Sequence, residues 1–294
     1  MSAFVRPTWV DQAEYPFADH VFEFDGNQIH YVDTGEGSTI LFVHRNPVWS
    51  FEYRDVIKEL QSSYRCIAVD LAGFGLSTSA PGFSHLPSAQ SEILRQFIEK
   101  LDLREYAIVV QDWGGPIGLS AALASPERLA RVVISNGWAW PVNGNPGFEK
   151  FSGLMGGPIG HFGSTYFNVF VKVVLPVSHK KRKLSRAEKA HYRKALPAGR
   201  REPTWVLPKQ IIASGAFLAD LEGRLPSLST LPALILWGDK DDAFQEPELL
   251  RWQQILPNAK TIVLHGVGHF APSESSLEFA RAIHEWSRGE IDDK

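Results

Sequence analysis

One short motif places an acidic side chain where a nucleophile is expected. Residues 110–115 read VQDWGG and lie between a strongly apolar run and a helical stretch. In a nucleophile elbow the reacting residue occupies a strained strand-to-helix turn and needs small neighbours, which Gly114 and Gly115 supply. Asp112 then stands where a serine is more usual. Taken alone, the same pattern also fits an aspartate that caps the following helix.

A histidine and a group of acids near the C-terminus could complete a catalytic set with Asp112. His269 lies in a glycine-rich loop after an apolar run, whereas the neighbouring His265 is typical of a solvent-facing loop. Residues 237–242 (WGDKDD) follow another apolar run and offer three carboxylates: Asp239, Asp241 and Asp242. The chain order aspartate, acid, histidine is that of an α/β-hydrolase triad. We therefore predict such a triad, with His269 as the base.

A parallel sheet would bring these motifs together. Two runs joined by a turn at Asp25-Gly26 are typical of a hairpin. Nearly continuous apolar runs, which suit strands buried on both faces, then occur at residues 39–44, 65–69, 106–111, 129–135, 233–237 and 260–264. Helical stretches separate most of them, at residues 52–60, 88–101, 115–124 and 276–288. This alternation predicts an α/β fold with right-handed crossovers.

The alternation is interrupted once, by a segment of different composition. Between residues 142 and 228 there are 14 lysines and arginines against 5 acidic residues, while the rest of the chain has 16 against 28. We predict a helical cap at residues 142–228, inserted into a core formed by residues 1–141 and 229–294. The basic run at 179–183 has no interleaved aromatic residues, so we interpret it as a solvated helix face rather than a nucleic-acid site.

Length and composition exclude several classes of protein. The chain has 294 residues, of which 44% are hydrophobic and 21% charged, the balance of an ordinary globular protein. No apolar run approaches the roughly 20 residues that a membrane span needs, and the first residues do not form a secretory signal. Cys66 is the single cysteine, so no intramolecular disulfide can form. We expect a buried thiol, a cytoplasmic location, and neither a membrane nor a nucleic acid as partner.

Together these motifs resemble those of the haloalkane dehalogenases in the α/β-hydrolase superfamily. The resemblance runs from about Tyr15 to Trp286 and includes HRNP at 44–47 and YRCIAVDLAGFGLS at 64–77. It implies a mostly parallel eight-stranded sheet flanked by helices, with a helical cap. It also implies hydrolysis of haloalkanes to an alcohol and a halide through an ester on Asp112, without metal or cofactor.

The resemblance assigns further roles. In this family the acid follows the strand either before or after the cap. Position 136, before the cap, is asparagine, so alignment of the 238–241 stretch selects Asp241. The side chains of Asn46 and Trp113 would bind the halide, and their backbone N–H groups the oxyanion, as in the branch with an Asn-Trp halide pair. The implied partners are a small haloalkane, water and halide, and copies of the chain are expected to self-associate.

The expected cavity is apolar, but one position departs from the family. Arg45 stands where the family has glycine, so its guanidinium would assist an anion, plug the cavity, or be held by a carboxylate. With Arg45, the candidate lining residues are Trp138, Trp140, Phe148, Phe151, Phe162, Phe167 and Phe170.

Other functions remain open. An epoxide hydrolase has the same mechanism but needs acid donors, for which Tyr166 and Tyr192 in the cap are candidates. A luciferase-like oxygenase and a non-catalytic binding protein on the same scaffold are further alternatives.

Overall fold

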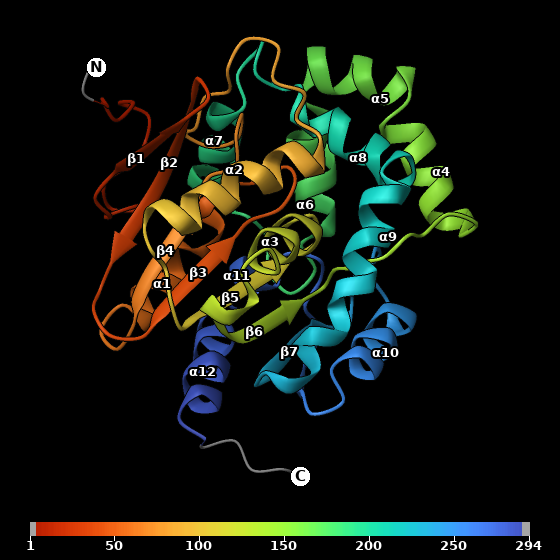
Figure 1. Cartoon of the computed structure of the whole chain (residues 1–294). Helices are drawn as coiled ribbons and strands as arrows, with labels where there is room; N and C mark the ends of the chain where they lie inside the picture. The colour runs from red at the N-terminus through yellow and green to blue at the C-terminus, as the bar shows by residue number, and fades with distance from the viewer. Residues whose placement is uncertain (1–3, 290–294) are drawn as a thin grey trace.

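Eight strands form one twisted sheet in the computed structural model, which describes residues 4–289 (Figure 1). The strands are β1 (His20–Phe24), β2 (Asn27–Thr34), β3 (Thr39–Val43), β4 (Arg65–Val69), β5 (Tyr106–Gln111), β6 (Leu129–Ser135), β7 (Ala233–Gly238) and β8 (Lys260–Leu264). Their order across the sheet is β1-β2-β4-β3-β5-β6-β7-β8. Only the β1–β2 and β2–β4 pairs are antiparallel within the described residues. The predicted eight-stranded, mostly parallel sheet is confirmed.

Local sequence explains both the antiparallel hairpin and the buried parallel strands. Asp25 and Gly26 both have positive φ angles, 48° and 73°, as a tight type I′ hairpin turn between β1 and β2 requires. In the parallel part of the sheet, β7, which lies between β6 and the edge strand β8, is buried along its whole length. A strand covered on both faces can be built from continuous apolar residues because neither face meets water.

Helices cover the two faces of the sheet. The chain moves one way across the sheet from β3 to β4 and the other way from β4 through β5 to β6. Right-handed crossovers therefore place α1 (Arg54–Leu60) on the opposite face from α2 (Pro87–Lys100) and α3 (Gly114–Ala122). Helix α2 packs against α3, and α1 packs against α12 (Ser276–Ser287). Helix α10 (Glu246–Ile255) connects β7 to β8, while the short elements η1 (Ser50–Tyr53) and α11 (Ala271–Glu274) follow β3 and β8 in the chain.

A set of helices interrupts the sheet between β6 and β7, and we call it the helical insertion. Figure 1 shows it beyond the carboxyl ends of the central strands. Its members are α4 (Pro146–Met155), α5 (Pro158–Phe162), π-helical η3 (Gly163–Phe167) and η4 (Phe170–Val174), α6 (Leu175–Ser178), α7 (Arg186–Ala195), α8 (Pro203–Ala213), α9 (Gly215–Arg224) and 3₁₀-helical η5 (Leu225–Thr230). Among residues 4–289 there is no helix of the length and apolarity needed to cross a membrane.

Candidate active site

The turn between β5 and α3 has a strained geometry that its sequence permits. Asp112 adopts a left-handed conformation with φ of 45°, which is uncommon for a residue other than glycine. A Cβ atom at Gly114 would lie 2.4 Å from the carbonyl oxygen of Val43, and one at Gly137 would lie 2.6 Å from the backbone nitrogen of Asp112. Glycine is therefore needed on both sides of the turn. Such a turn lifts the Asp112 side chain out of the sheet.

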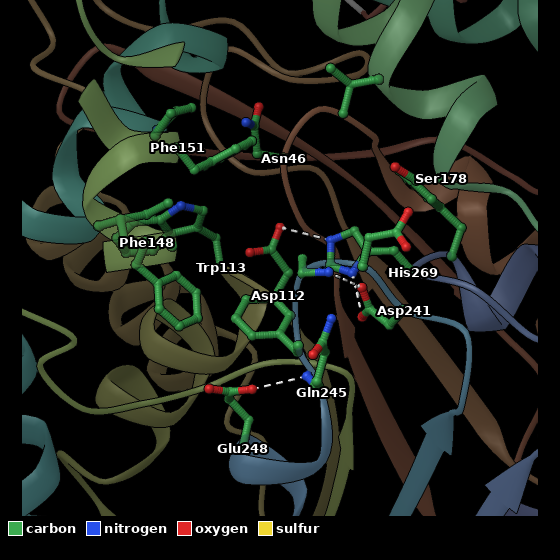
Figure 2. A pocket seen from close by; sticks show the side chains of 18 of the residues that line it. Asn46, Asp112, Trp113, Phe148, Phe151, Ser178, Asp241, Gln245, Glu248 and His269 are labelled. Carbon is green, nitrogen blue, oxygen red and sulfur yellow. Dashed lines mark hydrogen bonds and ion pairs between the residues drawn. The ribbon is translucent and has the colours of Figure 1, made fainter. Parts of the chain in front are cut away.

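Three loops at the carboxyl edge of the sheet bring Asp112, Asp241 and His269 together (Figure 2). The Nδ1 atom of His269 lies 2.7 Å from Oδ2 of Asp241, and its Nε2 atom lies 3.9 Å from Oδ2 of Asp112. Asp241 also accepts a hydrogen bond from the backbone N–H of Ala243 at 2.7 Å. His269 is thus held on one side by a buried carboxylate, and its other nitrogen faces Asp112.

Burial by itself raises the pKa of both carboxylates, but their partners oppose it to different degrees. Desolvation raises the pKa of Asp112 to about 6, although the charges of His269 and Arg45 oppose the rise. Burial also disfavours the charged form of Asp241, but the charge of His269 and its hydrogen bond outweigh that penalty and hold the pKa of Asp241 below its usual value. One carboxylate is therefore costly to ionise, and the other is held as an anion beside the imidazole.

The other two acids of the loop after β7 point elsewhere. Asp239 accepts a hydrogen bond from the backbone N–H of Gly266 at 2.7 Å and lies 3.2 Å from the exposed ring of His265. The Asp242 carboxylate is largely exposed and pairs with Lys180 at 2.7 Å. Of the three acids, Asp241 is the one whose carboxylate contacts His269.

Asn136, at the end of β6, links two strands of the sheet. Its amide oxygen accepts from the backbone N–H of Gly238 at 2.8 Å, and its amide nitrogen donates to the Gly238 carbonyl at 3.1 Å. The side chain is fully buried. Both halves of the amide therefore bridge β6 to β7, and Asn136 takes no direct part in the contact between His269 and its acid.

Two hydrogen-bond donors face the cavity beside Asp112. Figure 2 shows the Asp112 carboxylate between Trp113 and His269, with Asn46 farther away on another side of the cavity. The side chains of Asn46 and Trp113 both line the cavity. Asn46 carries an amide NH₂ group and Trp113 an indole N–H, and the buried amide oxygen of Asn46 has no hydrogen-bond partner among the described residues. Side-chain N–H donors in a cavity wall suit a leaving group that departs as an anion.

The cavity in front of Asp112 has a volume of about 450 Å³ and an aromatic lining. Phe148, Phe151 and Phe170 of the helical insertion line it, at positions where the sequence predicts lining residues. Phe244 and Phe270 also line it, and the sequence analysis missed both. The signal for each was present, because Phe244 follows the acid loop closely and Phe270 is next to His269.

Four other aromatic residues predicted to line the cavity do not. Trp138 lies in the core, where its ring packs edge-on against Trp113 with centroids 4.8 Å apart, so it supports the cavity wall from behind. Trp140 is buried against Trp252. Phe162 and Phe167 are each 58% exposed on the helical insertion. The prediction is wrong for these residues because the orientation of each backbone segment, and not aromatic character, decides which side chains face the cavity.

Arg45 does not line the cavity either, so that prediction is also wrong. Its side chain is fully buried, with Nε 3.3 Å from Oε1 of Glu52, while the guanidinium carbon lies 3.3 Å from the ring centroid of Phe270. Glu52 is on η1, and burial raises the pKa of this carboxyl although the Arg45 charge opposes the rise. The Arg45 guanidinium thus lies behind the cavity wall beside the Glu52 carboxylate. Of the three expectations for Arg45, this is the one in which a carboxylate holds the guanidinium.

Metal ligands do not gather at this site. Within residues 4–289 no group of three or more histidine, cysteine, aspartate or glutamate side chains is arranged to hold a metal ion. The site presents a carboxylate, an imidazole with its acid, and side-chain N–H donors.

Comparisons with known proteins agree with this geometry. Residues 38–276 match a family model described as the α/β hydrolase fold. The chain is 36% identical over 278 residues to a protein named haloalkane dehalogenase 2 from Mycobacterium tuberculosis, covering 94% of this chain and 96% of the relative. It is 28% identical to a cis-3-alkyl-4-alkyloxetan-2-one decarboxylase from Shewanella oneidensis, over 90% of this chain and 86% of that protein. The crystal structure of a haloalkane dehalogenase from Agrobacterium tumefaciens shares the fold, with a TM-score of 0.84, 24% identity, and coverage of 96% of this chain and 100% of that one.

Proposed function

Because the chain belongs to the haloalkane dehalogenase family of α/β hydrolases, we propose that it hydrolyses halogenated alkanes to an alcohol and a halide ion, with Asp112 as nucleophile. The observation that carries this assignment to particular residues is the position of the Asp112 carboxylate. It lies in a cavity that Asn46 and Trp113, with their side-chain N–H groups, also line, and it is 3.9 Å from the imidazole of His269.

In the first step the Asp112 carboxylate attacks the carbon that bears the halogen. A carbon–oxygen bond forms, the carbon–halogen bond breaks, and the halide leaves with the electron pair. The departing anion needs donors, which the amide of Asn46 and the indole of Trp113 supply from the cavity wall. The product of this step is an alkyl ester on Asp112.

In the second step His269 removes a proton from water, and the resulting hydroxide attacks the carbonyl carbon of the ester. The distance of 3.9 Å between His269 and Asp112 is too long for a direct hydrogen bond, which leaves Nε2 free for water. Asp241 stabilises the imidazolium that forms. Backbone N–H groups of Asn46 and Trp113 would hold the oxyanion until the alcohol leaves.

Substrate reaches this site from the helical insertion side. We propose that residues 142–228 act as a cap domain over a core made of residues 1–141 and 229–294. The cavity supports this division because Phe148, Phe151 and Phe170 line it from the insertion, while Asn46 and Asp112 line it from the sheet. We also propose a cytoplasmic location, which the buried Cys66 thiol fits.

Trapping the ester tests the assignment. His269→Phe should still be alkylated by a 1-bromoalkane but should not be hydrolysed, so intact mass spectrometry should show one alkyl adduct on the protein. His265→Phe is the matched control. The His265 side chain is 84% exposed, so this substitution should leave turnover unchanged. Absence of an adduct in His269→Phe, together with no halide release by the wild type, would reject the proposed function in favour of a binding protein or an oxygenase.

The epoxide hydrolase alternative is less well supported by the geometry. Such an enzyme needs acid donors in the cavity, but Tyr166 is 68% exposed and Tyr192 is buried against Phe51 with ring centroids 5.4 Å apart. Neither tyrosine lines the cavity among the described residues. Assaying an epoxide beside a bromoalkane separates the two activities.

A second candidate activity follows from the relative that is named as an oxetanone decarboxylase. Asp112 could open a four-membered lactone at its sp3 ring carbon, with the ring carboxylate leaving toward the same donors. Loss of carbon dioxide would then expel the Asp112 carboxylate as an alkene forms. The relative at 36% identity favours dehalogenation, and detection of an alkene from a cis-3,4-dialkyloxetan-2-one would favour the second activity.

A further inference from the structure

The loop that carries His269 is fastened to the helical insertion. Residues 178–182, which begin at the last residue of α6, run beside this loop, and we call them the strap. The backbone N–H of His269 donates to the Ser178 carbonyl at 3.2 Å. A Cβ atom at Gly268 would lie 2.4 Å from that carbonyl oxygen, so the two backbones are in close contact.

One buried carboxylate joins the strap to the loop. Glu274, on α11, is 5% exposed and accepts four backbone N–H groups. Its Oε2 atom accepts from Lys180 at 2.6 Å and Lys181 at 2.7 Å, both in the strap. Its Oε1 atom accepts from Gly268 at 3.1 Å and Phe270 at 3.3 Å, the residues on either side of His269. Charge-assisted hydrogen bonds of this kind are among the stronger ones in proteins.

The ring of Phe270 is also held from two sides. The His179 ring of the strap stacks on it with centroids 4.5 Å apart and planes 16° apart, and the Arg45 guanidinium carbon lies 3.3 Å from the same centroid. Two groups so close to one centroid would collide on one face, so they occupy opposite faces. The strap adds a hydrogen bond from Arg182 Nε to the Ser273 carbonyl at 2.6 Å.

We propose that Glu274 is a positioning residue for the hydrolysis step, acting through His269. By fixing the backbone on both sides of His269 to the strap, it sets where the imidazole stands between Asp112 and Asp241. This inference rests on the proposed function. Alkylation of Asp112 requires no proton transfer by His269, whereas hydrolysis does, so the effect belongs to the second step alone.

The test compares the two steps in Glu274→Gln. The glutamine keeps the size of the side chain, but it replaces one acceptor oxygen with an NH₂ group that cannot accept from two backbone donors. Misplacement of a reacting group by about 1 Å costs roughly 10²-fold in rate. We therefore expect the rate constant of ester hydrolysis to fall about 10²-fold, while the single-turnover halide burst stays close to wild type and alkyl-enzyme accumulates in intact mass spectra.

Glu278→Gln is the matched control. Glu278 binds Lys181 of the same strap at 2.9 Å, but its side chain is 47% exposed and it does not contact the loop of His269. Both steps should keep wild-type rates in this variant. Circular dichroism and the size of the halide burst measure how much of each variant is folded and active.

The outcomes separate the inference from the proposed function. Equal slowing of both steps in Glu274→Gln, or no accumulation of alkyl-enzyme, would overturn the positioning role. If Glu274→Gln does not fold, Glu274→Asp, which keeps the charge on a shorter side chain, is judged by the same ratio of the two rates. If His269→Phe also shows no adduct, the ester mechanism itself has failed. An adduct in His269→Phe without one in the Glu274 variant rejects the positioning role only.

Discussion

At the scale of single residues, Asp112 combines a catalytic requirement with a structural cost. The carboxylate must be ionised to attack carbon, yet it is 8% exposed and burial raises its pKa to about 6. The folded state therefore binds a proton at Asp112 more tightly than the unfolded chain does. Stability from this group is complete below the ordinary pKa of 3.8 and is lost as pH rises through about 6.

Asp112→Asn should accordingly stabilise the protein while abolishing turnover. A shift of about two pKa units corresponds to about 3 kcal/mol, so the free energy of unfolding at pH 7.5 should rise by up to that amount. The gain should shrink toward pH 4, where wild-type Asp112 is mostly protonated. Urea denaturation at several pH values measures it, with Asp242→Asn as a control on the exposed acid. An equal effect at pH 4 and pH 7.5 would contradict the burial argument.

Arg45 and Glu52 form a buried ion pair, so removing either residue alone should destabilise the protein. Arg45→Met would leave the fully buried Glu52 carboxyl without its cation, and breaking a buried pair in this way typically costs about 3–5 kcal/mol. Arg45→Met combined with Glu52→Met should recover most of that loss, because apolar side chains of similar volume replace such pairs well. Chemical denaturation of both single variants and the double variant measures the coupling. Additive losses would show that the two charges do not interact.

At the scale of elements, the loop after β7 carries three neighbouring acids, and we predict different functions for them. Asp241→Asn should lower kcat by orders of magnitude, since loss of a triad acid costs about 10⁴-fold in a well-studied protease. Asp242→Asn should stay near wild type because its carboxylate faces solvent and Lys180. Steady-state halide release, with melting temperatures to confirm folding, compares the two. A large loss in Asp242→Asn instead would reassign the acid.

The sequence predicts the strands that are buried on both faces, because such strands are continuous apolar runs. The apolar run of β5 and the glycines after Asp112 allow only a strand followed by a tight turn, so the positions of these elements could be read directly. The orientation of short helices could not. Phe148 and Phe151 are three residues apart on α4 and face the cavity, whereas Phe162 and Phe167 lie outward around the π-helical turn η3. Elements of five residues, such as α5 and η3, are too short for a hydrophobic periodicity that would show which side chains face the cavity and which face solvent.

The sequence allowed for a carboxylate partner of Arg45, but it could not identify Glu52 as that partner. Glu52 lies seven residues after Arg45, and an isolated glutamate is ordinarily a solvated residue. Its burial depends on η1 turning beneath the loop of Phe270, a tertiary arrangement that local pattern does not encode. Glu274 is similar, because its four partners come from segments about 90 residues apart in the chain.

At the scale of the whole molecule, the cavity between the sheet and the helical insertion sets substrate size. Its volume is about 450 Å³, and its walls include Trp113 and five phenylalanines. Each buried methylene contributes about 0.8 kcal/mol, or roughly fourfold in kcat/KM. Among 1-bromoalkanes from ethane to decane, kcat/KM should rise with chain length and then level off when the cavity is full. A series of initial rates measures this, and equal values throughout would place the alkyl chain outside the cavity.

The bridge made by Asn136 limits how the position of the triad acid can change in evolution. An aspartate at this site would present two acceptors, one of them to the Gly238 carbonyl, which now receives an N–H. A descendant that loses Asp241 therefore cannot regain its acid by one substitution at position 136, because the junction between β6 and β7 would have to be rebuilt as well. We expect a variant that lacks both Asp241 and the Asn136 bridge to be inactive and to have a weakened junction between β6 and β7. In this fold, moving the acid from the end of β7 to the end of β6 therefore costs one of the two hydrogen bonds with which the side chain at position 136 joins these strands.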